Sequence, residues 1–541
     1  MAPEGGNTIT FTEVDELNSP ASTLIYSELQ AGQPVKDSLG NEIRGRVDIA
    51  HVPGASTPWS TKSVRNLLTD VFLPAGYPHS VSEDYVPYQI FDSLQAFSSS
   101  IAGLLSSRAV LQGVGVGNAD ASPTSALLLH ILQDTSGRIA TILFAHRVGT
   151  ALEPECKMYR FAADIFNDLA MVLDCLSPMI PAGVSRVTVL SAAGVLRALC
   201  GVAGGSSKAS LSAHFAKWGN LAEVNAKDSS QETVISLVGM LVGSLVVSYI
   251  TSFVATWFTL LALLTLHLSL NYTAVRAVQM TTLNRQRANI VFSSMLSSDP
   301  DFALLSSDQS QDQHNYAEPG DQTERHLHIP SLAQVSRQER IFDASGTLKW
   351  SPHHHHHHHL KEEGQRRPRP EILGKCQIGV SPREFLSSPS SISTSSGSLK
   401  TFLPITALAS LFDDEDYILI FTPMTLGANT KRTAKILLKQ HATPKTHLKA
   451  WMHALLAARL LTRSYSPSAP SMQDEKKRGD ESSTEMGTVL STLERSLRFL
   501  NESSRFDGYI GALGDKGWEV DVDGSGVSAL ETRVGRRVIV S

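Results

Sequence analysis

The chain has 541 residues, which at about 150 residues per domain allows three or four domains. Its charged fraction is 18% and its net charge is −5, from 47 basic and 52 acidic residues. This balance excludes a global electrostatic attraction to nucleic acid. The four cysteines form no close pair, which excludes a disulfide scaffold and a CxxC zinc or redox site. Because typical globular proteins are roughly 25% charged, the low charge favours a membrane-associated protein with soluble parts.

The N-terminal region differs from the residues that follow it. Residues 1–60 are polar with short strand-like pieces such as 8–12, so we expect a polar, extended N-terminal arm. The first 20 residues are acidic and lack an apolar run, which argues against a secretory signal or a transit peptide. Residues 61–295 are predicted to form a helical core. Helix-length apolar stretches with few charges occur in it at 86–112, 123–148, 158–180 and 185–218.

The strongest feature of the core is a stretch of 43 residues, 233–275, without Asp, Glu, Lys or Arg. One bilayer span needs about 20 apolar residues, so the stretch suits two membrane segments, at about 234–250 and 253–270. In the first segment, Gly239 and Gly243 have the GxxxG spacing that lets two helices approach closely in lipid. The alternative is a buried hairpin in a soluble core. Membrane insertion is favoured because soluble helices rarely lack a charged face for so long.

Polar residues in this apolar region are the candidate functional residues. Asp164 and Asp168 are four apart, on one face of a predicted helix, and in a bilayer such groups must face a bundle interior, a partner charge or water. The alternative is a set of amphipathic helices outside the membrane. Residues 217–233 are interpreted as a capped helix start or as a polar vestibule of a membrane bundle. The candidate polar sites are His79, Asp92, Asp134, Arg138, Asp164, Asp168, Asn225, Lys227 and Gln231, and the candidate helix-packing residues are Gly239 and Gly243.

No catalytic or metal-binding motif stands out. Gly113, Gly115 and Gly117 resemble a phosphate loop, but Asn118 occupies the position of the third glycine of GxGxxG, so a helix break is the better interpretation. GxSxG, HExxH and Walker A patterns are absent. The seven histidines at 353–359 have no fixed geometry and favour low-complexity expansion over a selective metal site. We therefore expect no enzyme activity, no cofactor and no metal site.

The chain changes character again after the core. Residues 298–370 are rich in Ser, Gln, Asp, His and Pro and predict a mostly disordered linker that contains the histidine run. Residues 371–541 combine strand-like runs such as 417–421 with helices such as 447–461, and a charged, Ser-rich insert at 464–487 is predicted to be disordered. The predicted fold class is mainly α, with a multi-helix membrane-associated core and a smaller α+β C-terminal domain.

Several segments of the core carry a family resemblance. They include 73–85 (LPAGYPHSVSEDY), 112–117 (QGVGVG), 163–168 (ADIFND) and 225–233 (NAKDSSQET). In consistent order over about residues 62–292, these segments resemble the Root UVB Sensitive (RUS) family of DUF647-type proteins, and the C-terminal domain is similar with less specificity. In one departure, Asp134 precedes Thr where an Asp-Gly pair is expected, which argues against a tight turn after Asp134.

The resemblance implies a eukaryotic membrane protein of unestablished molecular activity. Plant relatives are associated with ultraviolet-B responses in roots, vitamin B6 homeostasis and auxin transport, and family members pair with each other. Our leading hypothesis is a non-enzymatic, multi-pass membrane protein, in contact with the lipid bilayer, that pairs with another RUS-family copy or paralogue.

A second hypothesis is a small-molecule transporter formed when two helical half-bundles dimerise. Asp134 and Arg138 belong to an Asp-x-x-Gly-Arg pattern that, as a loop between apolar segments, is loosely similar to loops of major facilitator transporters. An enzyme of vitamin B6 metabolism ranks last, because no lysine or phosphate cradle occurs in a suitable context.

Overall fold

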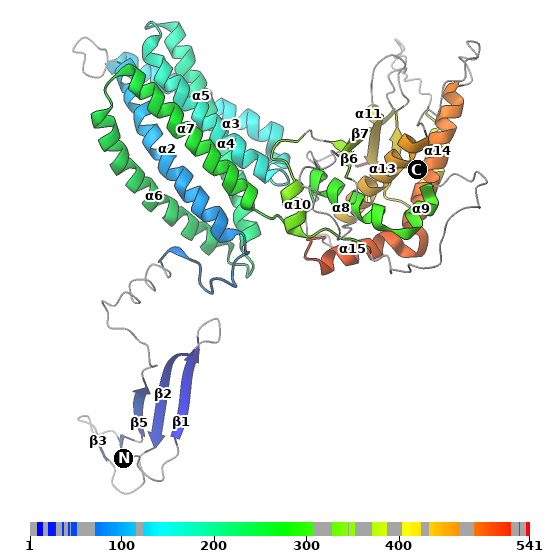
Figure 1. Cartoon of the computed structure of the whole chain (residues 1–541), viewed down its shortest axis with the longest axis horizontal. Coiled ribbons are helices and arrows are strands. Elements are labelled where there is room, and N and C mark those ends of the chain that lie inside the picture. The colour runs from blue at the N-terminus through cyan, green and yellow to red at the C-terminus, as the bar shows by residue number, and fades with distance from the viewer. Residues whose placement is uncertain are drawn as a thin grey trace, which may run out of the picture.

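The structure is a computed structural model with three parts, which are an N-terminal sheet, a bundle of long helices and a C-terminal α+β domain (Figure 1). The bundle and the C-terminal domain lie beside each other, with helix α10 (Leu332–Gln338) between them (Figure 1). The predicted fold class is confirmed. The residues that the structure describes are 8–14, 20–28, 35–36, 42–43, 45–50, 71–114, 123–306, 327–343, 346–351, 370–386, 403–422, 432–464, 481–520, 530 and 537–540.

The N-terminal region contains a folded sheet. Strands β1 (Thr8–Val14), β2 (Pro20–Glu28) and β5 (Gly45–Ala50) pair antiparallel in the order β1-β2-β5. Strand β3 (Val35–Lys36) pairs with β4 (Glu42–Ile43). The sequence predicted strand-like pieces here but not their pairing, since no strong turn signal in the sequence joins them.

The bundle consists of long helices at the predicted positions. Helix α2 packs against both α6 and α7, while α5 packs against α3 and α4. The bounds are α2 (Tyr85–Val114), α3 (Pro123–Val148), α4 (Cys156–Leu176), α5 (Val184–Phe215), α6 (Leu221–Tyr249) and α7 (Phe253–Ala277), with short 3-10 turns at η1 (Gly149–Ala151) and η2 (Ser177–Met179).

Helices α6 and α7 meet at the predicted break in the uncharged stretch. The side chain of Ser252 accepts a hydrogen bond from the backbone N–H of Ala255 at 3.2 Å and caps α7. Helix α6 begins at Leu221, and not near residue 234, because most of the polar segment 217–233 forms its first turns. At about 1.5 Å per residue, its 29 residues are long enough to cross a bilayer.

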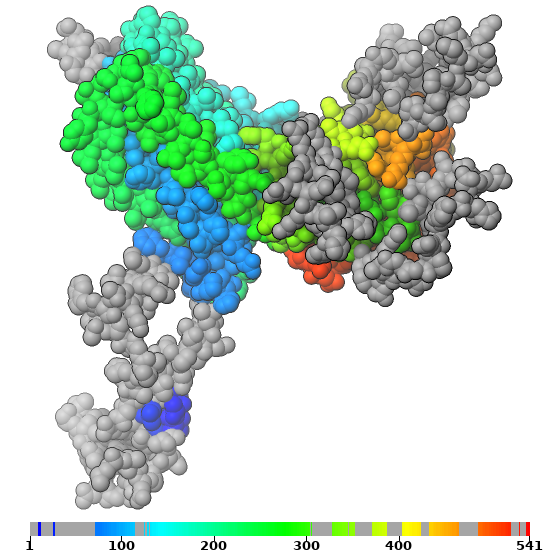
Figure 2. Space-filling view, in the orientation of Figure 1, coloured from blue at the N-terminus to red at the C-terminus, as the bar shows by residue number. Residues whose placement is uncertain are grey.

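Length and composition make α5, α6 and α7 candidate membrane spans among the described helices. The predicted membrane segments 234–250 and 253–270 lie in α6 and α7. The most apolar windows of the three helices are only 11–17% buried inside the protein. Their apolar side chains therefore face outward, and Figure 2 shows the α6 and α7 surface, in green, at the front and left of the bundle.

The C-terminal domain is built on a four-stranded sheet in the order β6-β7-β9-β8. Strand β7 pairs parallel with β9 and antiparallel with β6, and β8 pairs antiparallel with β9. The strands are β6 (Thr347–Trp350), β7 (Glu371–Ile378), β8 (Tyr417–Phe421) and β9 (Thr433–Leu438), and the helices are α8 (Arg285–Ser298), α9 (Pro300–Ser306), α10 (Leu332–Gln338), α11 (Pro382–Leu386), α12 (Ile405–Leu411), α13 (Pro444–Ser464), α14 (Glu481–Asn501), η3 (Glu502–Ser504) and α15 (Arg505–Asp515).

Two segments belong to the C-terminal domain although the sequence placed them elsewhere. Helix α8, assigned to the helical core, buries Phe292 and Met295 in the same apolar cluster as Trp451 of α13. Part of the predicted linker 298–370 is folded, because it supplies α10 and the edge strand β6. Helix α10 and strand β6 are seven and four residues long. Elements this short do not produce a periodic pattern of apolar residues that a sequence analysis could detect. The histidine run 353–359, residues 465–480 of the insert, and Gly115 and Gly117 lie outside the described residues.

Candidate functional site

Helix α4 turns charged side chains toward the interior of the bundle. Its buried residues include Arg160, Asp164 and Asp168, which are four apart and share one face. Leu169, outside that face, is 48% exposed. A helix with its charges inside and apolar side chains outside is suited to lipid surroundings, since charges in a bilayer must face a bundle interior or a partner.

These α4 side chains meet others from α2 and α7. Arg160 donates from Nη2 to Asp92 Oδ1 at 2.7 Å, from Nη1 to Asp164 Oδ1 at 3.0 Å, and from Nε to the Tyr88 hydroxyl at 3.3 Å. The guanidinium thus joins α2 to α4 inside the bundle. We call the following buried side chains the central cluster: Asp92, Arg160, Asp164, Asp168, His267 and Asn271.

Helix α7 contributes the remaining members of the central cluster. His267 Nδ1 lies 2.7 Å from Asp168 Oδ1, and its Nε2 lies 3.7 Å from Asp164 Oδ2. Asn271, one turn further along α7, donates from Nδ2 to the same Asp164 oxygen. Three carboxylates therefore surround one guanidinium and one imidazole.

Some acceptors of the central cluster have no partner. Asp168 Oδ2 and Asn271 Oδ1 are buried and make no hydrogen bond within the described part of the chain. Asp168 is 4% exposed and Asn271 is fully buried. Since buried polar atoms are usually hydrogen-bonded, each of these oxygens can accept a further donor or positive charge.

The other buried carboxylates of the bundle lie opposite basic side chains. Asp84 Oδ2 is 3.0 Å from His214 Nε2, and the backbone N–H of Gln279, distant in the chain, donates to the same oxygen. Asp174 pairs with Arg197. Asp228 Oδ2 is 2.7 Å from Lys208 Nζ. These contacts match each acidic group with a basic one, whereas the central cluster has more acidic than basic groups.

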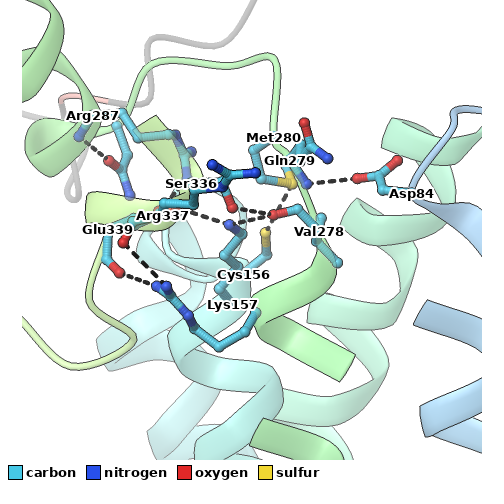
Figure 3. A network of polar contacts seen from close by, with 12 residues as sticks. Asp84, Cys156, Lys157, Val278, Gln279, Met280, Arg287, Ser336, Arg337 and Glu339 are labelled. Carbon is cyan, nitrogen blue, oxygen red and sulfur yellow. Dashed lines mark hydrogen bonds and ion pairs between the residues drawn. The ribbon is translucent and has the colours of Figure 1, made fainter. Parts of the chain in front are cut away.

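A second buried network joins the bundle to the C-terminal domain (Figure 3). Lys157 Nζ donates to Glu339 Oε2 at 2.6 Å and to the Val278 carbonyl at 2.7 Å, and Arg287 Nη1 donates to Glu339 Oε1 at 2.6 Å. Ser336 also donates to the Val278 carbonyl. Burial alone would raise the pKa of Glu339, but Arg287 and Lys157 bring it below its ordinary value. This junction holds the first turn of α4, directly before Arg160.

The structure brings together three of the predicted polar residues, Asp92, Asp164 and Asp168. Asp134 and Arg138 are not with them. They form an exposed ion pair of 2.9 Å on α3, with side chains 55% and 77% exposed. Helix α3 runs through these positions without interruption, so the loop proposed for this pattern is wrong. The departure from an Asp-Gly pair fits this result, because Thr135 can continue the helix.

The remaining predicted residues lie near the start of α6 or before α2. Lys227 Nζ donates to the Val71 carbonyl at 3.2 Å, and Gln231 Nε2 donates to the Phe72 carbonyl at 2.5 Å. These side chains fasten the segment before α2 onto α6. His79 and Asn225 are exposed and lie apart from the central cluster.

Gly239 and Gly243 are helix-packing residues, but their partner helix is α2 of the same chain. A Cβ at Gly239 would lie 2.8 Å from the Ser100 Cβ, and one at Gly243 would lie 2.8 Å from Leu104 Cδ1. The GxxxG face is therefore covered within the chain, which removes the reason for assigning it to a partner molecule.

Sequence reasoning missed Arg160, His267 and Asn271 as site residues. A usable signal was present for two of them, because His267 and Asn271 are four apart in an otherwise apolar helix. Polar groups at this spacing in a membrane segment share one face and favour a bundle interior.

Comparison with known proteins relates the bundle to one family. Residues 58–299 match the family model described as "Vitamin B6 photo-protection and homoeostasis domain". The match includes the whole central cluster. No solved structure matches the chain.

Similar proteins come from a slime mould and a plant. "RUS family member 1" of Dictyostelium discoideum is 46% identical over 231 residues, which are 42% of this chain and 44% of that protein. "Protein root UVB sensitive 3" of Arabidopsis thaliana is 36% identical over 41% of this chain and 50% of its own length. "Protein root UVB sensitive 6" of the same plant is 25% identical over 79% and 70%. The chain thus spans about half the length of the first two relatives.

Proposed function

Residues 58–299 place this chain in the root UVB sensitive (RUS) family, and from this premise we propose that the protein is a multi-pass membrane protein that carries a small polar molecule through its helical bundle. The proposal involves no catalysed reaction. The central cluster is the observation that carries it.

The outer surface of the bundle supports membrane insertion. On α6, Leu241 and Leu245 are 62% and 61% exposed, and on α7, Val254 and Phe258 are 75% and 76% exposed. Soluble monomers rarely expose such a continuous apolar surface. Lipid is the proposed environment of this face.

The interior of the bundle supports transport. Ionisable groups inside a membrane are energetically unfavourable and mark substrate, ion or proton pathways. The central cluster places Asp92, Asp164 and Asp168 around Arg160 at the contact of α2, α4 and α7. A purely structural role would be served by apolar packing, since replacing a buried ion pair by apolar residues is often neutral or stabilising.

The cargo is proposed from the chemistry of the cluster and from the description of the family model. Excess carboxylates suit a molecule with a basic nitrogen. Vitamin B6 vitamers contain a pyridine nitrogen, and pyridoxamine also contains an amine. Because the matching family model is described by vitamin B6 homoeostasis, these vitamers are the first cargo to test.

The test has two steps. Alkaline carbonate extraction of membranes from expressing cells should leave the protein in the pellet; release into the supernatant would contradict the membrane proposal. Purified full-length protein in liposomes should then take up labelled pyridoxamine or pyridoxine faster than protein-free liposomes. Asp164→Asn should reduce the initial rate at least tenfold, whereas Asp134→Asn, an exposed helical Asp of the same domain, should leave it unchanged. Equal rates in both variants would contradict a role of the central cluster.

Pairing with a second RUS-family copy is a separate proposal. Gly239 and Gly243 are not available for such an interface, because α2 of the same chain covers both. The exposed apolar side chains of α3, such as Ile142 and Leu143, are 68% and 63% exposed and suit either lipid or a second bundle. Crosslinking of two differently tagged copies in liposomes tests this proposal separately from transport.

A further inference from the structure

We infer that the central cluster binds one monovalent cation at its unpartnered oxygens, of which Asp168 Oδ2 belongs to a carboxylate. This inference rests on the proposed function, because it assumes a bilayer around the bundle, and it names the class of ligand that the site takes.

The first argument is the charge of the cluster. Asp92, Asp164 and Asp168 are each less than a tenth exposed, and Arg160 is the fixed positive charge among them. With three carboxylates and one guanidinium, the cluster lacks two positive charges. An uncompensated charge in surroundings of low dielectric constant is strongly unfavourable. The cluster must therefore acquire positive charge when it is surrounded by lipid.

His267 can supply one of the two charges. Its Nδ1 faces Asp168 Oδ1 at 2.7 Å and its Nε2 faces Asp164 Oδ2 at 3.7 Å. Both ring nitrogens thus point to carboxylate oxygens, which is the environment that a doubly protonated imidazole satisfies, because both of its nitrogens are donors. One positive charge then remains to be supplied.

The unpartnered oxygens show where that charge binds. Asp168 uses Oδ1 for His267 and leaves Oδ2 without a partner, and Asn271 uses Nδ2 for Asp164 and leaves Oδ1 without one. Asp168 contacts the His267 imidazole, and Asn271 contacts the Asp164 carboxylate that faces the other nitrogen of the same ring. They are acceptors, so their missing partner is a donor or a cation.

The other cation near these groups, Arg197 of α5, is paired with Asp174. His267 is faced from α4 by Arg160, Asp164 and Asp168, and α2 adds Asp92 through Arg160. Helix α5 brings the thiol of Cys200 within electrostatic range of Asp164 and Asp168. A thiol carries no positive charge in either form. Among the groups recorded around the imidazole, Arg160 is thus the permanent cation.

A monovalent cation fits better than a divalent metal. In the described part of the chain, no group of three or more His, Cys, Asp and Glu side chains is arranged to hold a metal ion. The one missing positive charge can come from a proton on Asp168, an alkali ion or the ammonium group of a cargo molecule. These share the chemistry of a single positive charge on a carboxylate oxygen, and experiment can separate them.

The test uses thermal unfolding of the full-length protein in detergent and needs no transport. Unfolding temperatures are measured at pH 8 with choline chloride as the reference salt, and with equal concentrations of NaCl, KCl or methylammonium chloride. A second series in choline chloride lowers the pH from 8 to 6. A cation present at about 100 times its dissociation constant should raise the unfolding temperature by roughly 5–10 °C.

Matched variants assign the effect to the cluster. Asp168→Asn should abolish the cation-dependent rise, and Asp134→Asn should retain it. Asn271→Asp adds a carboxylate and should steepen the dependence on cation concentration, because two cations are then needed. This variant retains every carboxylate of the cluster and keeps the inference testable if Asp168→Asn does not fold.

Each outcome decides the inference. A rise with a salt that Asp168→Asn loses supports a bound alkali or ammonium ion, and a rise only on acidification that Asp168→Asn loses supports a bound proton. No rise in either series, or the same rise in Asp168→Asn, overturns the inference. Cation binding without uptake by liposomes would contradict the carrier proposal alone, whereas uptake without cation binding would contradict this inference alone.

Discussion

Lys157 and Glu339 form a buried ion pair of 2.6 Å across the boundary between the helical bundle and the C-terminal domain, with side chains only 8% and 5% exposed. Glu339 also accepts from Arg287 of α8, so one carboxylate neutralises a cation from each side. Lys157 lies three residues before Arg160. The C-terminal domain therefore fixes the helix on which much of the central cluster is built.

Glu339→Gln should destabilise the junction strongly. The substitution leaves Lys157 and Arg287 buried beside a neutral amide, and breaking a buried pair costs about 3–5 kcal/mol. We expect a lower unfolding temperature of the full chain in detergent. Glu494→Gln, which removes an exposed pair with Arg498 on α14, should cost less than about 1 kcal/mol. Similar losses in both variants would show that the junction contributes no more than a surface pair.

Glu155, at the same junction, should make stability depend on pH. Burial raises the pKa of this carboxyl from 4.5 to about 7, with Arg287 opposing the rise and Glu339 adding to it. A raised pKa in the folded state means that the contribution to stability is fully present below pH 4.5 and is lost as the pH rises through 7. The stability of Glu155→Gln minus that of the wild type should therefore be larger at pH 8 than at pH 5. Unfolding temperatures at the two pH values measure this, with Glu153→Gln, an exposed neighbour, as the control.

His453 should give the opposite dependence in the C-terminal domain. The side chain is fully buried, and its Nδ1 and Nε2 contact the Tyr417 hydroxyl at 2.9 Å and Ser496 Oγ at 2.8 Å. Burial lowers the pKa from 6.5 to about 3. The stability it contributes is therefore present above pH 6.5 and is lost as the pH falls toward 3.

Below pH 6.5 the free energy of unfolding should fall by up to about 1.4 kcal/mol per pH unit for this one group. Denaturant titrations of the full chain at pH 7.5, 6 and 5 measure the slope. His453→Gln should flatten it, and His441→Gln, an exposed control, should not. An unchanged slope in His453→Gln would assign the acid sensitivity to other groups.

Gly239→Ala should destabilise the bundle through α2. The added Cβ would lie 2.8 Å from the Ser100 Cβ and 3.0 Å from the Phe97 carbonyl oxygen, so α2 and α6 must move apart. Overpacking of this kind costs about 1–3 kcal/mol. Gly201→Ala on α5 is the matched control, because its Cβ meets no atom within 4 Å, and it should be neutral or stabilising by up to about 1 kcal/mol. Thermal unfolding in detergent compares the two variants, and equal stability would argue against a close α2–α6 contact.

Sequence patterns located most of the bundle. The absence of charge over 233–275 and the apolar stretches before it correctly placed α2–α7, because helix-length apolar runs leave a signal in composition alone. The same reasoning identified Asp164 and Asp168, whose spacing puts them on one face of α4. Asp92 was also among the candidate polar residues, and the structure places it against Arg160 in the central cluster.

Distant contacts could not be predicted in this way. Asp134 looked as promising as Asp164, but α3 lies at the outside of the bundle and leaves the Asp134 pair with Arg138 in an exposed position. Periodicity shows which face of its own helix a residue lies on. It does not show which other helix, if any, packs against that face. In the same way, the GxxxG spacing predicted close packing at Gly239 and Gly243 but could not identify α2 as the helix that packs there.

By itself, the sequence determined the helical class of the core, its membrane character as a proposal and its family resemblance, because these properties depend on local composition and on ordered motifs. Only the tertiary structure decided that Arg160, His267 and Asn271 join the acidic residues, and that α8 and α10 belong to the C-terminal domain. The physical reason is that the contacts between helices in this charge cluster join side chains 68 to 107 residues apart in the chain. Their encounter is set by the packing of α2, α4 and α7, which no local pattern contains.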